Sequence, residues 1–324
     1  MTTTKQAERK PRFKRAKVRP FAVQERDLDI IKQVYKHRFL TSEHIAALID
    51  GSGQGILRRL QLLYHAGYLD RPREQIKPYH AGSTAMVYGI GNKGADYLSQ
   101  ALNVPRSKVD WTSKNREAKT VFLEHTLEIA NFMVCLELAC RQTKNVQLIG
   151  PAEILRPTAK HKKENALAWA VGKIIKDEKT GDRKHYNFSL VPDKLFGLHF
   201  PEDPPDRNKA FFFLEVDRST MPINRSNLFR TSFAKKLSLY WESWQQGLFE
   251  QNFHFKNARV LTLAKSPARI VSMIEAVKEA DERKKGSRMF MFALDKFFDP
   301  AQPATALERI WQNGRDSELL SLVD

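Results

Sequence analysis

Five polar residues in the second half of the chain have the types and spacing that metal-dependent hydrolysis of a phosphodiester requires. Glu215 and Asp217 lie two positions apart at the end of the apolar run AFFFLEVD, so a strand there points both carboxylates to one face. Asp193 stands at the start of an earlier predicted strand. Lys236 and Tyr240 are four positions apart on a predicted helix and share a face of it.

These side chains supply the groups that a metal-dependent nuclease uses. Mg²⁺, with Mn²⁺ as a substitute, binds one or two carboxylates together with water and phosphate. Asp193 and Glu215 are the predicted metal ligands, and Asp217 is a candidate third ligand. The metal would lower the pKa of its bound water and neutralise charge on the scissile phosphate. Lys236 would serve the water or the phosphate, and Tyr240 would position it.

Each of these residues also has a purely structural interpretation. Asp193 follows a proline, where an aspartate is often a turn residue or a cap. Lys236 would then be one more solvated charge on a helix. The two carboxylates at the end of AFFFLEVD would form ion pairs with Arg218 or Arg225.

The elements that would position these residues follow one another in a simple order. After a predicted linker at 104–116, a long amphipathic helix carries His125 and Glu128, which are candidate accessory residues. A histidine with apolar neighbours on a helix is also typical of a structural residue. Apart from an inserted hairpin, the later elements give the order α, two or three β, α, β. Residues 117–324 therefore predict one αβββαβ domain, within the α/β (α+β) fold class.

Residues 22–103 predict a winged helix-turn-helix that binds DNA. Three short helices precede two strands, with Thr41 or Ser42 as the N-cap of the second helix and Gly67 as the C-cap of the third. A third helix of this kind enters the major groove, and the wing touches the flanking backbone. An alternative is a winged helix that makes only protein contacts. The predicted DNA contacts are Gln54, Arg58, Arg59, Lys77 and His80.

Residues 1–21 predict a disordered basic arm. Positions 1–20 hold eight Lys and Arg residues and a single acidic residue, Glu8. We expect Arg12, Lys14 and Arg15 to lie along phosphates, although a solubilising tail has the same composition. The whole chain has a net charge of +17, which suits double-stranded DNA as the partner.

Several classes of protein are disfavoured by what the sequence lacks. It has no apolar run long enough for a membrane span and no secretory signal, so no membrane partner is expected. Cys135 and Cys140 are interpreted as reduced core residues of a cytoplasmic protein, without a zinc pattern. The chain also lacks an ATP-binding loop, a relaxase histidine cluster and the paired arginines of a tyrosine recombinase.

Three motifs carry a resemblance to known families. PDKLFGL, FFFLEVDRST and KKLSLY resemble the PD-(D/E)XK nuclease superfamily, which implies a restriction-endonuclease-like domain. That superfamily has a lysine two residues after the glutamate, where this chain has Asp217. Some branches take the lysine from the next helix, followed by a tyrosine four residues on, as Lys236 and Tyr240 are arranged here. Lys235 is the fallback.

The chain over about 22–265 more closely resembles the replication-relaxation family of mobile-element proteins. The resemblance rests on HRFLT, RRL and GYLDR in the first half, and on HTL, PD, FFLEVDR, K and Y in the second. It implies a role in the replication or transfer of a plasmid or integrative element, with element-encoded proteins as further partners. A homodimer is compatible with a winged helix, but no coiled-coil heptad demands one.

Two functions remain open on the sequence alone. One is site-directed DNA binding coupled to Mg²⁺-dependent phosphodiester hydrolysis. The other is a catalytically inactive nuclease fold that serves as a DNA-binding regulator or replication accessory factor. A membrane-surface role for the basic arm is disfavoured, because the arm has no apolar face.

Overall fold

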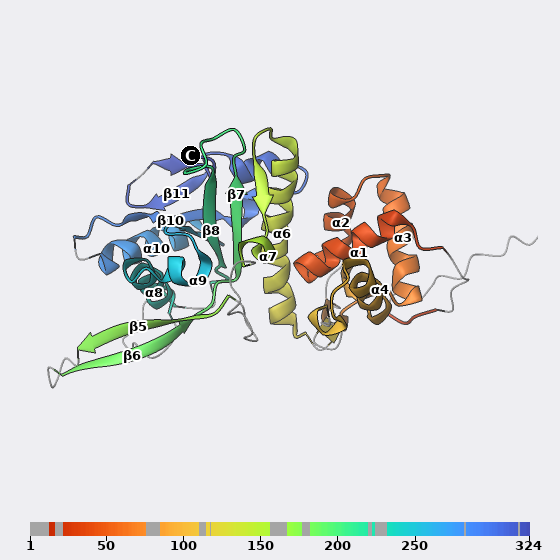
Figure 1. Ribbon diagram of the computed structural model, residues 1–324, viewed down its shortest axis with the longest axis horizontal. Coiled ribbons are helices and arrows are strands. Elements are labelled where there is room, and N and C mark those ends of the chain that lie inside the picture. Colours follow the sequence, from red (N-terminus) through yellow and green to blue (C-terminus); the bar gives the residue numbers. More distant parts are fainter. Residues whose placement is uncertain are drawn as a thin grey trace, which may run out of the picture. The chain divides into compact units, whose positions relative to one another are not determined.

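A computed structural model of the chain describes residues 13–16, 22–75, 85–109, 115–116, 118–155, 167–176, 182–219, 222–223, 232–281, 283–316 and 318–324. The chain divides into two compact units, Met1–Val134 and Cys135–Asp324, and the division falls inside helix α6 (Thr120–Gln142) (Figure 1). The predicted mixed α and β class is confirmed. Arg12, Lys77, His80 and Arg225, which the sequence analysis singled out, lie outside the described residues.

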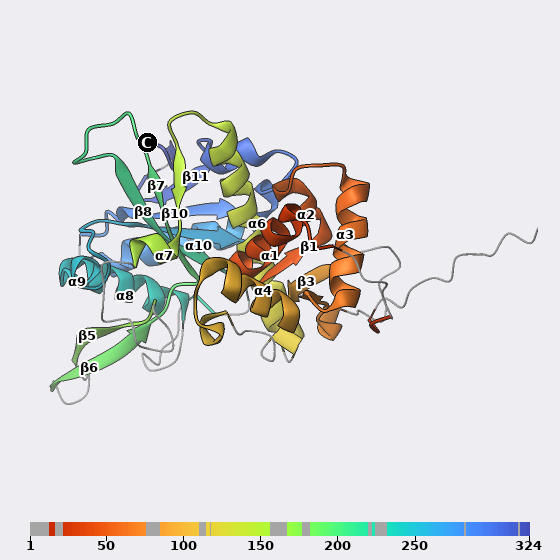
Figure 2. The ribbon, with the colours of Figure 1, turned by 45° about the vertical axis from the view of Figure 1, so that its right-hand side comes forward.

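The first unit packs helices against a small antiparallel sheet (Figure 2). The sheet has the order β1-β3-β2, so the last strand lies between the first two. Its apolar core draws Ile30, Ile31 and Val34 from the first helix and Ile56, Leu60 and Leu63 from the third. The elements are α1 (Glu25–His37), β1 (Phe39–Thr41), α2 (Ser42–Leu48), α3 (Gly53–Ala66), β2 (Leu69–Asp70), η1 (Arg73–Gln75), β3 (Val87–Ile90), α4 (Asn92–Leu102) and η2 (Arg106–Lys108).

The helix ends of this unit follow from local side-chain chemistry. Thr41 is the N-cap of α2, where its hydroxyl accepts a hydrogen bond from the backbone N–H of His44 at 3.1 Å. Ser52 caps α3 in the same way. Gly67 ends α3 with a φ of 96°, in the left-handed region that glycine adopts without a steric penalty. The predicted caps at Thr41 and Gly67 are therefore confirmed.

A buried ion pair joins α1 to α3 in this unit. Asp27 is fully buried, and Nε of Arg59 donates to its Oδ1 at 2.9 Å while Nη2 contacts the other oxygen. Arg59 also donates to the carbonyl of Ala22 at 3.2 Å. Arg59, a predicted DNA contact, is therefore held inside the unit by its guanidinium, whereas its neighbour Arg58 is exposed.

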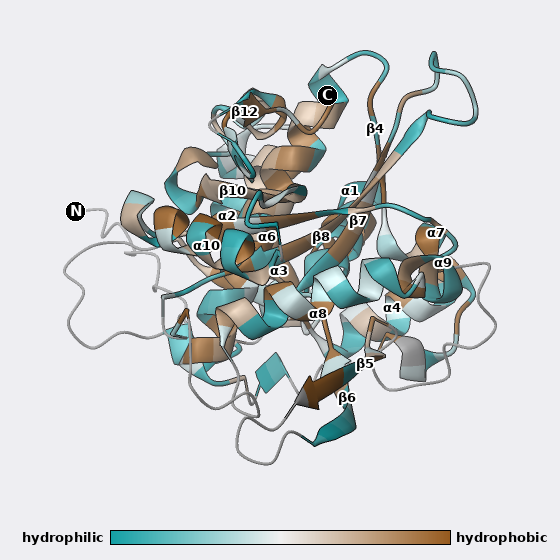
Figure 3. Ribbon diagram, turned by 90° about the vertical axis from the view of Figure 1, so that its left-hand side faces the viewer, coloured by the Kyte–Doolittle hydropathy of each residue, from teal (hydrophilic) through white to brown (hydrophobic). Residues whose placement is uncertain are grey.

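The second unit is built on a seven-stranded sheet of order β12-β11-β10-β9-β8-β7-β4. Strands β8, β9 and β10 are parallel to one another, and the outer strands pair antiparallel. Apolar residues dominate the central strands (Figure 3). The elements are β4 (Gln147–Ile149), α7 (Pro151–Ile154), β5 (Trp169–Lys176), β6 (Arg183–Leu190), β7 (Lys194–His199), β8 (Lys209–Val216), α8 (Phe233–Gln245), α9 (Leu248–Phe253), β9 (Arg259–Ala264), α10 (Pro267–Ala280), β10 (Ser287–Leu294), η3 (Asp295–Phe297), η4 (Pro303–Leu307), β11 (Trp311–Gly314) and β12 (Leu319–Leu320).

The core of the second unit lies between one face of this sheet and helices α8 and α10. Phe213, Val260 and Phe292 from the strands meet Leu237 and Met273 from the helices in one buried cluster. Every one of these side chains is at most 2% exposed. Helices α8 and α10 therefore cover the sheet face on which the Glu215 side chain of β8 lies.

Packing at the start of α6 explains why the unit boundary differs from the predicted linker at 104–116. Leu123 of α6 packs in a small cluster with Phe39, Val87 and Ala118, all of them in the first unit. The first turns of the helix thus complete the first unit's core. The sequence analysis instead began the second domain at residue 117, because the amphipathic pattern does not reveal which partner each turn has.

We predict that the Arg59→Met variant destabilises the first unit by about 3–5 kcal/mol, because it leaves the buried Asp27 carboxylate without its cationic partner and with only the N–H of Gln24 as a donor, at 2.8 Å. Arg58→Met, a change of the same type on an exposed neighbour, should stay within about 0.5 kcal/mol of the wild type. Urea unfolding combined with hydrogen exchange at the amides of α1 and α3 measures both. Equal stabilities for the two variants would show that the ion pair does not hold these helices together.

Candidate active site

The run AFFFLEVD divides its side chains between the two faces of strand β8. On one face Phe211 stacks against Phe255 with ring centroids 4.4 Å apart, and Phe213 lies 5.5 Å from the ring of Tyr240. Glu215 follows on that face and is 4% exposed. The strand alternation therefore takes the carboxylate of Glu215 into the layer beneath α8.

Helix α8 directs two side chains onto this carboxylate. Lys236 and Tyr240 are one turn apart, so they share the face that covers β8. The Nζ of Lys236 donates to Oε2 of Glu215, and the Tyr240 hydroxyl donates to Oε1 at 2.5 Å. Both oxygens of the buried carboxylate are thus engaged. The predicted pairing of these three residues across β8 and α8 is therefore present as a direct contact.

Asp193 lies beside this group because it is hydrogen-bonded to the backbone on both sides of Glu215. Its N–H donates to the carbonyl of Leu214 at 3.1 Å, and its Oδ2 accepts from the N–H of Val216 at 2.8 Å. Asp193 precedes β7, the neighbour of β8, so the strand pairing fixes its position. We call Asp193, Glu215, Lys236 and Tyr240 the carboxylate cluster.

Burial and charge act in opposite directions on the carboxylate cluster. Burial raises the pKa of Glu215 to about 7, although the ammonium of Lys236 opposes the shift; Asp193 adds to it. Burial lowers the pKa of Lys236, but Glu215 and Asp193 outweigh it and the net shift is upward. Burial and the Glu215 charge raise the pKa of Tyr240 well above its usual value. The cluster therefore binds or releases a proton near neutral pH.

A buried hydroxyl with unused hydrogen-bonding capacity lies next to Glu215. Thr262 of β9 pairs in register with Glu215 and is fully buried. Val260 and Ala264, two positions to either side, pack in the cluster beneath α8 and α10, which places Thr262 on the same face. Its Oγ1 has no hydrogen-bond partner among the described residues. Such groups are rare in folded proteins and often mark a place for a water, an ion or a ligand.

Asp193 and Glu215 fit a Mg²⁺ site only if water and a substrate phosphate supply the other ligands. The described residues contain no group of three or more His, Cys, Asp or Glu side chains that would hold a metal. Asp193 and Glu215 supply two carboxylates, and Mg²⁺ commonly completes its shell with water and substrate phosphate. The orphaned hydroxyl of Thr262 is compatible with an additional polar group there. A metal on Glu215 would use lone pairs that Lys236 and Tyr240 leave open, or would replace one of these contacts.

Asp217 has a partner of its own in the second unit. Arg269 of α10 donates to its two oxygens at 2.8 and 2.9 Å, and the N–H of Ser219 donates to Oδ2 at 3.1 Å. This bidentate ion pair ties the end of β8 to α10. We therefore leave Asp217 out of the metal set. Nothing in the sequence pairs Asp217 with a residue so distant along the chain, so the sequence analysis named other arginines for this role.

The remaining candidates are Lys235 on α8 and two residues of α6. Lys235, the fallback lysine, places its Nζ 4.1 Å from the ring centre of Phe188. His125 and Glu128 are half-buried on the part of α6 that belongs to the first unit, whereas the carboxylate cluster belongs to the second.

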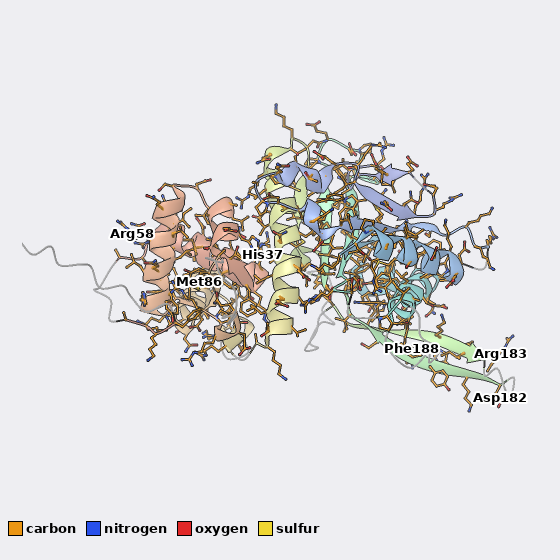
Figure 4. All side chains as sticks on the ribbon, turned by 180° about the vertical axis from the view of Figure 1, so that it is seen from behind. His37, Arg58, Met86, Asp182, Arg183 and Phe188 are labelled. Carbon is orange, nitrogen blue, oxygen red and sulfur yellow. The ribbon has the colours of Figure 1, made fainter. Side chains whose placement is uncertain are left out.

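Some predicted DNA contacts of the first unit are exposed and others are engaged. Gln54, Arg58 and Lys14 are exposed. Arg15 contacts the carboxylate of Asp70, donates to the carbonyl of Leu69 at 3.0 Å and lies 4.8 Å from the ring centre of Tyr64. Figure 4 shows Arg58 pointing outward from α3.

Comparison with known proteins gives one match. The family model described as replication-relaxation matches residues 31–256, which is more than half of the chain. Searches of the curated proteins and of the solved structures found no match.

Cys135 and Cys140 are buried free thiols, as expected. Within the described residues, no helix has both the length and the apolar character needed to span a bilayer.

The raised pKa of Glu215 predicts a pH dependence of stability. The folded state holds the proton more tightly than the unfolded chain, so the free energy of unfolding falls as pH rises from about 4.5 to about 7. Glu215→Gln does not titrate there. The wild type should therefore lose about 1–3 kcal/mol relative to this variant between pH 5 and pH 8, in the absence of divalent cations.

Urea unfolding of both proteins across this pH range measures the difference. Glu250→Gln, at an exposed position of α9, is the matched control and should follow the wild type. Parallel pH profiles for the wild type and Glu215→Gln would contradict the burial argument.

Proposed function

Because the chain belongs to the replication-relaxation family, we propose that it acts on DNA in the replication or transfer of a plasmid or integrative element. The observation that carries the proposal is the carboxylate cluster, in which Lys236 and Tyr240 both donate to the buried Glu215. A buried carboxylate with a strongly shifted pKa and a cationic partner is a frequent mark of a reaction centre.

The first unit would bind duplex DNA as a winged helix-turn-helix. Support comes from three helices that precede β2 and β3, with β1 between the first two helices, an order in which α3 takes the place of a recognition helix. Gln54 and Arg58 are exposed on that helix, while Arg59 is held by Asp27. DNA contact therefore falls to Gln54 and Arg58 rather than to the whole basic stretch.

The second unit would hydrolyse a phosphodiester bond. Bound Mg²⁺ would supply charge neutralisation at the phosphate and a more acidic water. Asp193 and Glu215 would hold the ion, and the Lys236 side chain, 27% exposed, would then turn its ammonium from Glu215 to the phosphate. Tyr240 is fully buried and would keep one oxygen of Glu215 in place. Asp217 would stabilise the site through Arg269.

One observation favours a second candidate function, a nuclease fold without catalysis. Both oxygens of Glu215 already accept hydrogen bonds, and the described residues contain no group of three acidic, His or Cys side chains that would hold a metal. A cluster that is complete without metal would act as a structural element. The protein would then be a DNA-binding regulator or a replication accessory factor.

We predict Mg²⁺-dependent nicking or cleavage of supercoiled plasmid that carries the element's own replication region. Asp193→Asn and Glu215→Gln should each lower the rate by about 100-fold or more, because each removes a metal-binding charge. Glu250→Gln, a similar change at an exposed position of α9 outside the cluster, should keep the wild-type rate. Agarose gel assays with Mg²⁺, Mn²⁺ or EDTA measure this. Absence of cleavage by the wild type, with DNA binding retained, would support the regulator instead.

Duplex binding by the first unit is predicted separately. Arg58→Ala should weaken duplex affinity, and if Arg58 contacts a phosphate, the slope of log affinity against log salt should fall by about 1. Lys144→Ala removes an exposed charge from the second unit and should leave affinity unchanged within a factor of about 2. Fluorescence anisotropy across a salt series measures both. Unchanged binding by Arg58→Ala would exclude α3 as the contact helix.

A further inference from the structure

Strands β5 and β6 form a two-stranded ribbon that extends from beneath α8, away from the seven-stranded sheet (Figure 1). Eight residue pairs join the strands, from Trp169 with Leu190 at the base to Lys176 with Arg183 at the far end. At about 3.3 Å per residue the ribbon is roughly 25 Å long. An isolated two-stranded ribbon is marginally stable in water, so its base must be anchored.

The base is anchored on α8, the helix that carries the lysine and tyrosine of the carboxylate cluster. Trp169 is 5% exposed and its Nε1–H donates to Oγ of Ser243 at 2.9 Å. Gln246, just after α8, donates to the carbonyl of Gly172 at 2.8 Å. Lys173 lies 3.4 Å from a carboxylate oxygen of Glu242. The ribbon is therefore a fixed part of the second unit on the side of Lys236 and Tyr240.

Strand alternation gives the ribbon two different faces. The inner face directs Trp169, Val171 and Leu190 into the core beneath α8. Among the residues that the structure describes, none packs on the outer face in that way. It presents exposed Arg183, His185, Asn187 and Ser189 from β6, with exposed Ala170 and Ile174 and the half-buried Gly172 from β5.

The outer face contains the side chains that read base edges in the major groove. Arginine bonds to guanine, asparagine to adenine, serine to several bases, and small apolar groups contact the thymine methyl. No hydrogen bond or ion pair within the described chain engages the side chains of Arg183, His185, Asn187 or Ser189. Ile174 is 63% exposed on the same face, where its apolar side chain is available to a thymine methyl.

The charge of the ribbon also suits DNA. Its two strands contain no Asp or Glu and hold Lys173, Lys176, Arg183 and Lys184. Figure 4 shows Asp182 and Arg183 at the far end and Phe188 nearer the body of the unit. A two-stranded ribbon has the width that the major groove of B-DNA admits, and groove binding by such ribbons uses one face.

We propose that the outer face of the β5–β6 ribbon lies in the major groove of duplex DNA and reads its bases. The inference rests on the proposed function in one respect, that the protein binds duplex DNA. It adds a second reading surface, on the unit that carries the carboxylate cluster. The ribbon would thereby set the position in the DNA sequence at which the carboxylate cluster meets the DNA backbone.

Gly172 fits this role because it lets the outer face stay flat. A Cβ at Gly172 would come within 2.7 Å of Nε2 of His185 on the opposite strand. The imidazole therefore lies across the ribbon over the glycine, where it covers the backbone. A larger residue at this position would displace His185 from the surface.

The test uses the full-length protein and a duplex that the wild type selects from a random-sequence pool. Arg183→Ala and Asn187→Ala change the outer face, and Lys184→Ala removes a neighbouring exposed charge that alternates to the inner face. Affinity is measured for the selected duplex, for single base-pair variants of it and for unrelated duplex, each over a salt series. Thermal unfolding checks that every variant is folded.

Asn187→Ala should lower affinity for the selected duplex by about 5- to 100-fold and relax preference at one or two adjacent base pairs. It removes no charge, so the salt slope should not change. Arg183→Ala should relax preference at a different base pair. Lys184→Ala should reduce binding to all duplexes equally, with no change of preference.

Three results would overturn the inference. Wild-type specificity retained in both outer-face variants would show that the ribbon does not read DNA. If the wild type nevertheless binds duplex DNA and Arg58→Ala loses this binding, the proposed function remains intact. A uniform loss of affinity with a lower salt slope would mean phosphate contact without base reading. Failure of the wild type to bind or select any duplex would overturn the inference and the proposed function together.

Discussion

The structure of the second unit depends on how the carboxylate of Glu215 is stabilised after burial. An isolated buried carboxylate is strongly unfavourable, so partners must reach it from outside its own strand. Helix α8 supplies Lys236 and Tyr240, and its other contacts hold the base of the β5–β6 ribbon. Burial raises the pKa of Glu215 to about 7, and the negative charge of Asp193 adds to this shift. The protonation state of Glu215 is therefore linked to the position of α8, the helix on which the base of the β5–β6 ribbon is anchored.

Three buried ion pairs in the molecule show how similar chemistry serves different purposes. Asp27 with Arg59 and Asp217 with Arg269 are bidentate arginine pairs, in which the planar guanidinium matches both carboxylate oxygens. Such pairs fix helices and strands. Glu215 instead has a lysine, a compact charge on a flexible stem that remains partly exposed, and a tyrosine on its other oxygen. A lysine can leave for a phosphate at lower cost than a bidentate arginine can, and this difference makes Glu215, rather than the other two carboxylates, the candidate reaction centre.

The basic residues of this chain, whose net charge is +17, also divide into those held by carboxylates and those exposed to solvent. Arg59 and Arg269 are held by buried carboxylates, and Arg15 is engaged by Asp70. Arg58 on α3 and Arg183 on the ribbon are exposed, the first on a helix that packs in the core of its unit and the second on a ribbon anchored at its base. Recognition of DNA requires a fixed scaffold with exposed donors, and these two positions combine both properties. Total charge indicates the class of partner, but only exposure on a fixed element identifies the contacts.

The sequence by itself predicted the order of the longer helices and strands, a cap at Thr41 or Ser42 and another at Gly67, the inserted hairpin and the grouping of Asp193, Glu215, Lys236 and Tyr240. These features depend on local periodicity and on spacing along one element, which a sequence records directly. Tertiary structure alone decided which charges are paired. The partners of Asp27 and Asp217 come from elements far away in the chain, and the partner of each turn of α6 depends on packing. Ion pairing and burial arise from contacts between distant segments, and no spacing rule within one segment encodes them.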